Sequence, residues 1–413
     1  MRGFAVTAGL LGALLALSAV AGAATFKPTR HDDPTPGPCK PKDCSLREAI
    51  IAANGDSAAK VVLGKGTYKL EIPPTDPDGT PEDGDLNISS GMQVLGKGPQ
   101  RTKIDGDGVD RVFLITQISG HVLLRGLTVK GGDPYQHPNQ TSTLGGGIWA
   151  YAFDTVKLVN VAIRHNNAQF GGGFRDQTPK VVLKKSTIAS NTATQGGGGF
   201  NIPIGLFNPS VLQITSSTIQ GNLAATGGGI LADGSSMSPD DDEPDIRLTN
   251  STVAGNMTSN EAAGLFADNG ALMTLDNTTV AYNQANTDDV GVAVAAGIYQ
   301  HSGSTVTVGD SIIASNTVGQ GGSDPDCSGT FSGDGNVLGA GTGCGDFSPA
   351  TNQFVGSALI GTLADNGGST KTIALKPTSP ALGYAETCPA KDQRGEKRPN
   401  NNCDSGSYER KGN

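Results

Sequence analysis

A six-residue pattern of small, β-branched and polar residues recurs along the middle of the chain. Each unit reads small-Thr-Ile-x-x-Asn or a close variant, and successive units start 25, 31, 34, 27 and 33 residues apart. The units occupy residues 161–166, 186–191, 217–222, 251–256, 278–283 and 311–316. Short β-branched runs that are broken by Gly and Asn and repeat at this period predict an all-β solenoid, a parallel β-helix with three short strands per coil.

The asparagine that ends each unit forms a column, from Asn166 to Asn316, when the coils are stacked. Asparagine tolerates the left-handed backbone conformation of a turn, and its amide can bond the equivalent amide one coil along. We therefore expect an internal ladder of asparagines that stabilises the fold.

A second pattern, a run of small residues before a short strand, begins with residues 145–147 and returns in the later repeats. The apolar residue after each run is expected to point inward: Ile148, Phe174, Phe200, Ile230, Leu265 and Ile298. Because side chains alternate along a strand, the next residue in each repeat should point outward. This outward column reads Trp149, Arg175, Asn201, Leu231, Phe266 and Tyr299. Its aromatic side chains, ~4.8 Å apart per coil, can stack on sugar rings or pack beneath a loop, so Trp149, Arg175, Asn201, Phe266 and Tyr299 are candidate ligand-binding residues.

The N-terminus has the features of a secretory signal. Met1 and Arg2 precede an apolar stretch over residues 10–20, which ends in Ala21-Gly22-Ala23. The stretch is too short for a membrane anchor, and no later run approaches the ~20 apolar residues that a bilayer requires. We predict cleavage after Ala23, an extracellular protein and no membrane span.

Composition and charge narrow the set of partners. Sixty glycines with only 5% aromatic residues indicate many tight turns and a thin core. The formal net charge is −9, or −10 once Arg2 leaves with the signal, and no Lys/Arg cluster offsets it. Nucleic acid is therefore not an expected partner.

Six cysteines remain after the predicted cleavage. An even number in a secreted chain favours disulfides, and these six fall into three local pairs along the sequence. We predict the bridges Cys39–Cys44, Cys327–Cys344 and Cys388–Cys403. The last two would staple the C-terminal end of the solenoid.

The segment after Cys44 has the pattern of a short amphipathic helix, with Leu46, Ala49, Ile50 and Ala53 on one face. A helix there would cap the open first coil. Residues 44–49 read Cys-Ser-Leu-Arg-Glu-Ala, which resembles the signature of the CSLREA family of bacterial secreted and surface proteins.

The C-terminus resembles a second module, the choice-of-anchor Q region. The resemblance rests on residues 363–368, 370–372, 379–381, 392–395, 398–399 and 403–404. Together the two resemblances imply a right-handed parallel β-helix in an extracellular location, without implying one activity. The ending over residues 404–409 departs from the usual Asp-Ile-Gly-Ala pattern, so covalent surface anchoring is not implied.

These patterns predict four segments: residues 1–23 as the signal peptide, 24–59 as an N-terminal tail and capping segment, 60–320 as the parallel β-helix, and 321–413 as C-terminal coils and cap.

The fold resembles that of pectate lyases, polygalacturonases and tailspike-type glycanases, so an enzyme is the rival hypothesis. The carboxylates at residues 286–289 lack the companion motifs of a galacturonan hydrolase and are expected to form a solvated loop. Closely spaced acids beside Arg247 could bind Ca²⁺, although a solvated turn is the alternative. The candidate metal ligands are Asp240, Asp241, Asp242 and Asp245.

No complete catalytic motif emerges from the sequence, and the catalytic residues remain unknown. The five histidines are scattered over different repeats, with no spacing that indicates a partner for general-base catalysis. No cofactor is required by these patterns. The leading interpretation is a secreted, non-enzymatic β-helix that binds a surface polymer, such as a carbohydrate, or a cell-surface partner, as an adhesin-like or envelope-associated protein. A pectate-lyase-like polysaccharide lyase or a glycoside hydrolase is the alternative.

Overall fold

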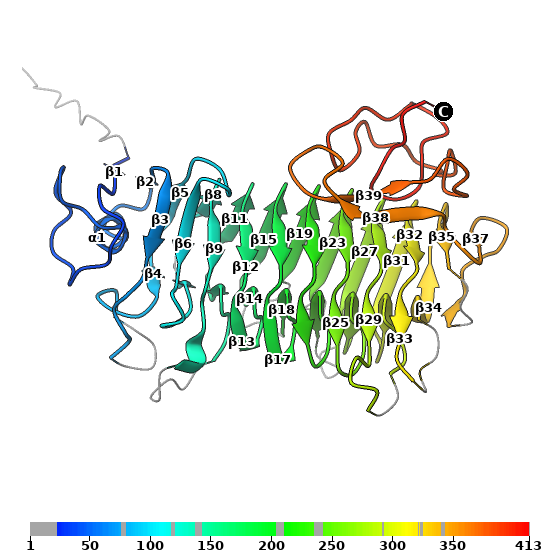
Figure 1. The fold of residues 1–413 in the computed structure, drawn as a ribbon, viewed down its shortest axis with the longest axis horizontal. Helices are drawn as coiled ribbons and strands as arrows, with labels where there is room; N and C mark the ends of the chain where they lie inside the picture. Colours follow the sequence, from blue (N-terminus) through cyan, green and yellow to red (C-terminus); the bar gives the residue numbers. More distant parts are fainter. Residues whose placement is uncertain are drawn as a thin grey trace, which may run out of the picture.

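The chain forms an elongated solenoid whose coils stack from the N-terminal end to the C-terminal end (Figure 1). The computed structural model describes residues 23–75, 80–116, 120–136, 143–203, 210–234, 243–290, 293–320, 322, 325–339 and 343–412. The predicted signal peptide lies almost entirely outside these residues. Across them, no helix is both long enough and apolar enough to cross a membrane.

One coil of the solenoid contains four short strands in succession. In one central coil these are β11 (Thr155–Val159), β12 (Ala162–Arg164), β13 (Asn167–Phe170) and β14 (Phe174–Asp176). The next strand, β15 (Lys180–Lys184), pairs in parallel with β11 and begins the following coil. The predicted right-handed parallel β-helix is therefore confirmed, with a fourth, short strand position that the sequence pattern did not separate.

Equivalent strands of successive coils form four parallel sheets, numbered here in the order in which the chain visits them. Sheet 1 contains β1 (Thr25–Phe26), β2 (Ala59–Val62), β5 (Met92–Leu95), β8 (Val122–Arg125), β11, β15, β19 (Val211–Thr215), β23 (Asp245–Thr249), β27 (Leu272–Asp276) and β31 (Thr305–Gly309). Sheet 2 contains β3 (Gly66–Lys69), β6 (Thr102–Asp105), β9 (Thr128–Lys130), β12, β16 (Thr187–Ala189), β20 (Thr218–Gln220), β24 (Thr252–Ala254), β28 (Thr279–Ala281), β32 (Ile312–Ala314), β35 (Val337–Leu338) and β37 (Gln353–Phe354). Sheet 3 contains β13, β17 (Thr192–Gly196), β21 (Leu223–Ala224), β25 (Met257–Thr258), β29 (Gln284–Ala285) and β33 (Thr317–Val318).

Sheet 4 contains β4 (Leu86–Ile88), β7 (Phe113–Ile115), β10 (Ile148–Ala150), β14, β18 (Phe200–Ile202), β22 (Ile230–Asp233), β26 (Leu265–Asp268) and β30 (Ile298–Gln300). Strand β34 (Cys327–Ser332) pairs with both β30 and β31, and β36 (Cys344–Gly345) pairs with β34. A 3₁₀ turn, η1 (Pro134–Gln136), lies between β9 and β10.

The core is a column of apolar side chains inside the coils. Every residue predicted to point inward from sheet 4 is fully buried: Ile148, Phe174, Phe200, Ile230, Leu265 and Ile298. Phe174 and Phe200 stack with ring centroids 5.1 Å apart. The alternation of the sequence therefore identified the buried face correctly.

The asparagine ladder is present at the turn between sheets 2 and 3. The side-chain amide of each asparagine donates to the Oδ1 atom of the next over distances of 2.9–3.0 Å, from Asn166 to Asn316. The ladder ends on Asp326, whose Oδ1 accepts from Asn316 at 2.8 Å. One part of the prediction is wrong, because the left-handed conformation belongs to the preceding residue, such as His165 with φ 54°. The ladder therefore requires the side-chain amide of asparagine and not its tolerance of the left-handed backbone conformation.

The glycine runs form the corner between sheets 3 and 4. Gly197 has φ +66°, and a Cβ atom there would lie 2.6 Å from the Cβ atom of Asn201. Two residues further on, a Cβ atom on Gly199 would lie 3.1 Å from the ladder amide of Asn222. The small-residue runs therefore make room for the outward column on one side and for the asparagine ladder on the other.

Helix α1 (Leu46–Ala53) caps the first coil, as predicted. Ser45 is its N-cap and forms a capping box with Glu48, whose carboxylate accepts from the Ser45 amide at 2.7 Å. Cys44, just before the cap, is bridged to Cys39. Capping boxes satisfy otherwise unpaired amides at the start of a helix.

Arg47 fixes this helix to the chain around it. Its side chain is fully buried, and it bonds both carboxylate oxygens of Asp33 at 2.8 and 2.9 Å. The guanidinium also donates to the carbonyl oxygens of Asp83, Gly84 and Asp85. Several residues of the Cys-Ser-Leu-Arg-Glu-Ala motif thus have an identifiable role in building the N-terminal cap.

The C-terminal segment from residue 356 onward lies along one long side of the rod, over sheet 2 (Figure 1). It contains an antiparallel pair, β38 (Ile360–Ala364) and β39 (Thr372–Leu375). Gln393 is its main anchor, donating to Thr218 Oγ1 at 2.9 Å and accepting from Thr252 Oγ1 at 2.6 Å. We call residues 356–412 the side cap.

The three predicted disulfides are present. Cys327–Cys344 joins β34 to β36 near the last coils, and Cys388–Cys403 lies within the side cap. Cys39–Cys44 lies beside α1.

Candidate functional site

The six residues predicted to point outward lie in register on successive strands of sheet 4. Cα pairing runs from Trp149 through Arg175, Asn201, Leu231 and Phe266 to Tyr299. The column is not an open aromatic face, however. Asn201, Leu231 and Phe266 are only 2%, 8% and 6% exposed.

The N-terminal half of the column is occupied by contacts within the protein. The Arg111 guanidinium lies 5.0 Å from the ring centroid of Trp149, whose indole NH donates to Gln177 at 3.0 Å. Arg175 lies 5.4 Å from the ring of Phe170 and bonds Asn201. Burial lowers the pKa of the Arg175 guanidinium to about 10. Trp149 and Arg175 therefore contribute to packing, and ligand binding by either residue stays a prediction.

The C-terminal half of the column forms an aromatic cluster in which Phe266 is buried and Tyr299 is partly exposed. Phe266 and Tyr299 stack with ring centroids 5.0 Å apart and an interplanar angle of 7°. The ring of His301 lies 5.4 Å from that of Tyr299, and the His301 side chain is 52% exposed. Burial, followed by the charges of Glu261 and Asp268, raises the pKa of the Tyr299 hydroxyl.

A groove of about 320 Å³ runs beside this cluster where sheets 3 and 4 meet. Its lining comes from both sheets and includes Phe170, Thr226, Leu231, Asp233, Phe266 and Asp268. The glycine corner opens the groove, because a side chain at Gly196 would lie 2.5 Å from Leu231 Cδ2. We call this feature the corner groove.

Two carboxylates from neighbouring coils line the corner groove. Asp233 and Asp268 are Cα partners at the ends of β22 and β26, and both are partly buried. Asp233 accepts a hydrogen bond from Asn269 Nδ2 at 2.8 Å. Asp268 Oδ1 lies 2.8 Å from His301 Nδ1. A carboxylate that orients an imidazole beside a second carboxylate is an arrangement suited to proton transfer.

Asp233, Asp268 and His301 were not predicted as site residues. Each lies two positions after a member of the outward column, so strand alternation places it on the same face. Strand alternation is therefore the sequence signal that marks these three positions. Two histidines have carboxylate partners that no spacing in the sequence indicated: His301 pairs with Asp268, and His121 pairs with Asp154, both at 2.8 Å.

The candidate calcium loop is only partly described. Asp240, Asp241 and Asp242 lie outside the described residues. Asp245 is bound by Arg247, whose Nε atom lies 2.9 and 3.0 Å from the two carboxylate oxygens. Within the described ranges, no group of three or more His, Cys, Asp or Glu side chains could hold a metal ion. Calcium binding by this loop stays a prediction.

Residues 286–289 are joined to Gln320, just after β33, by two hydrogen bonds. Asn286 is buried and donates from its amide to the Gln320 carbonyl at 3.2 Å. Asp289 accepts from the Gln320 amide at 2.9 Å. Both contacts suit a structural role for this segment.

Comparisons with known proteins reveal similarity of fold. No family profile matches the chain, and no curated protein matches it. A pectate lyase structure superposes with a TM-score of 0.51 at 13% identity, covering 94% of this chain and 98% of that one. A mannuronan C-5 epimerase A-module from Azotobacter vinelandii gives a TM-score of 0.45 at 17% identity, over 80% of this chain and 87% of its own. The chain thus shares the right-handed β-helix fold of pectate lyase, while the CSLREA and choice-of-anchor resemblances stay predictions.

Proposed function

We propose that this protein is a secreted β-helix that binds a carbohydrate polymer in the corner groove. The observation that carries the proposal is the stacked pair Phe266–Tyr299, with His301 and two carboxylates beside it. Aromatic rings offer flat apolar surfaces, and carboxylates accept hydrogen bonds from hydroxyl groups. A sugar presents both kinds of surface.

The repeating geometry favours a polymer over a small molecule. The lining of the corner groove is contributed by strands of successive coils, which follow one another at ~4.8 Å. An extended chain can therefore contact several coils at once. The three disulfides fit an extracellular setting, where a surface or envelope polymer is available as the partner.

Affinity electrophoresis tests this proposal. It measures binding to a panel of neutral and acidic polysaccharides, with and without Ca²⁺. Tyr299→Ala should weaken binding of the preferred polymer about tenfold or more, because it removes the ring that stacks on Phe266, which lines the corner groove. Phe354→Ala is the matched control, since Phe354 is 45% exposed at the end of sheet 2. Equal binding by wild type and Tyr299→Ala, or no binding across the panel, would contradict the proposal.

Glycoside hydrolysis is a second candidate, favoured by the positions of Asp233, Asp268 and His301. Paired carboxylates on neighbouring coils are the groups that such a reaction requires. Release of reducing ends that falls by about 100-fold or more in Asp268→Asn, with polymer binding retained, would establish it. Absence of products with binding retained would leave the non-enzymatic function as the better account.

A further inference from the structure

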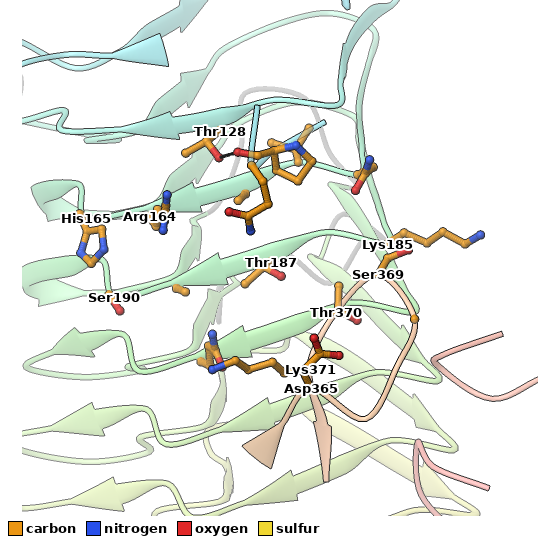
Figure 2. A pocket seen from close by; sticks show the side chains of 18 residues that line it. Thr128, Arg164, His165, Lys185, Thr187, Ser190, Asp365, Ser369, Thr370 and Lys371 are labelled. Carbon is orange, nitrogen blue, oxygen red and sulfur yellow. Dashed lines mark hydrogen bonds between the residues drawn. The ribbon is translucent and has the colours of Figure 1, made fainter. Parts of the chain in front are cut away.

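A second cavity lies on a different face of the molecule, between the outer surface of sheet 2 and the loop that joins β38 to β39 in the side cap (Figure 2). Its volume is about 360 Å³. Sheet 2 contributes Thr128, Arg164 and Thr187, and the side cap contributes Asp365 and Lys371. We call it the cap pocket.

The charged side chains around the cap pocket are mostly basic. Arg164 lies on one side, with His165 next to it, and Lys371 lies on the other; Lys185, in the turn between β15 and β16, points its side chain away from the pocket (Figure 2). Asp365 is the one acidic residue in the lining that the structure describes. This concentration of positive charge contrasts with the net charge of −9 of the chain.

Arg164 differs from its neighbour in the same column of sheet 2. Lys130, its Cα partner one coil earlier, is paired with Asp105. By contrast, the Nε atom of Arg164 is buried without a hydrogen-bond partner among the described residues. The next position in the column is Ala189, whose small side chain leaves space beside the guanidinium.

We propose that the cap pocket binds a carboxylate or sulfate group of an acidic polysaccharide. The planar guanidinium of Arg164 matches either oxyanion, and Lys371 adds a second positive charge from the facing loop. The pocket has a volume of about 360 Å³ and few basic groups. It therefore fits one or two charged sugar residues rather than the long phosphate backbone of a nucleic acid. This site is separate from the corner groove, and the proposal does not depend on the groove.

Fluorescence anisotropy with labelled tetrasaccharides tests the proposal on the full mature protein. The probes are an oligogalacturonate, a chondroitin sulfate fragment and neutral maltotetraose, all at low salt. At least one acidic probe should bind, the neutral one should not, and the stronger acidic probe identifies the group that is recognised. Binding of neither acidic probe, or of all three probes alike, would overturn the proposal.

Charge-removing variants locate the binding. Arg164→Gln and Lys371→Gln should each weaken binding of the acidic probe about tenfold, because each removes a charge-assisted hydrogen bond. Lys60→Gln removes the same charge from an exposed position in β2 and should change affinity less than about twofold. An equal loss in all three variants would indicate general electrostatic attraction and would overturn the assignment to the cap pocket.

A variant that removes a negative charge gives a further test, because its expected effect on affinity is opposite to that of the other variants. Asp365→Asn should strengthen binding about twofold or more, because it removes the one negative charge while keeping the oxygen that accepts from the Gly367 amide. A decrease in affinity would contradict the proposal. Tyr299→Ala should leave this binding unchanged, which separates the cap pocket from the corner groove. A duplex oligonucleotide that binds more tightly than either sugar, with the same dependence on Arg164, would overturn the choice of ligand.

Discussion

Asp176 places a carboxyl group inside the solenoid, where its partner on the preceding coil is Ala150. The side chain is fully buried and accepts hydrogen bonds from the amide and hydroxyl of Thr178 at 2.9 and 2.8 Å. Burial raises the pKa of this carboxyl to about 7, and these hydrogen bonds offset only part of the effect. The folded protein therefore holds the Asp176 proton more tightly than the unfolded chain does.

This raised pKa predicts a pH-dependent contribution to stability. Because the folded pKa exceeds the unfolded value of about 3.9, the contribution is fully present below that value and is lost as pH rises toward 7. Asp176→Asn removes the titration, so the free energy of unfolding of the variant relative to wild type should increase by about 2–3 kcal/mol between pH 5 and pH 8.

Urea unfolding at several pH values measures this difference. Exposed Asp346→Asn is the control and should show no such trend. A parallel dependence on pH in wild type and Asp176→Asn would show that the carboxyl does not titrate in this range.

At the scale of elements, the asparagine ladder couples one coil to the next. Asn222 donates from its amide to Asn256 Oδ1 at 2.9 Å and to the Ile188 carbonyl at 3.1 Å. Its own Oδ1 accepts from both the backbone amide and the side-chain amide of Asn191 at 3.0 Å. All these groups are buried, so the loss of one asparagine leaves partners on both neighbouring coils unsatisfied.

Asn222→Ala should therefore lower the free energy of unfolding by about 3 kcal/mol or more. Asn260→Ala, at an exposed position between β25 and β26, should change it by less than about 0.5 kcal/mol. Thermal and denaturant unfolding measure the stability of the two variants. Similar losses in the two variants would mean that the ladder contributes no more than a surface residue.

The sequence predicted the features that repeat with the coils. The asparagine ladder, the buried apolar column and the corner of small residues each recur in the coils of the middle of the chain, so one pattern determines many contacts. The pairing of Asp268 with His301 follows the register of the strands, but these residue types meet at one pair of coils and no repeating pattern marks them. Contacts such as that between Thr218 and Gln393 join residues 175 apart, and no periodicity relates them.

At the scale of the whole molecule, the side cap links distant coils through a few polar contacts. It contacts sheet 2 from β20, through Thr218 and Lys371, to the turn before β35, through Ser405 and Gly335. A solenoid whose coils contact only their neighbours can unfold progressively from one end. A segment that spans several coils opposes this, because those coils must then separate from the side cap together.

Gln393 is the residue on which this attachment can be tested. Gln393→Leu removes bonds to Thr218, Thr252 and Thr370 while keeping a side chain of similar size. We expect faster amide hydrogen exchange in residues 356–412, because the side cap separates locally from sheet 2. The strands β11 and β15, which precede the region under the cap, should keep their protection.

Hydrogen exchange followed by mass spectrometry distinguishes this local opening from general destabilisation. Gln284→Leu, at an exposed position in β29, is the control and should leave exchange unchanged. Faster exchange in β11 and β15 as well would mean that cap and solenoid unfold as one cooperative unit. In either case Gln393→Leu should weaken anion binding in the cap pocket. Lys371 lines that pocket, and its carbonyl oxygen accepts a hydrogen bond from Gln393, so the variant releases Lys371 from its position.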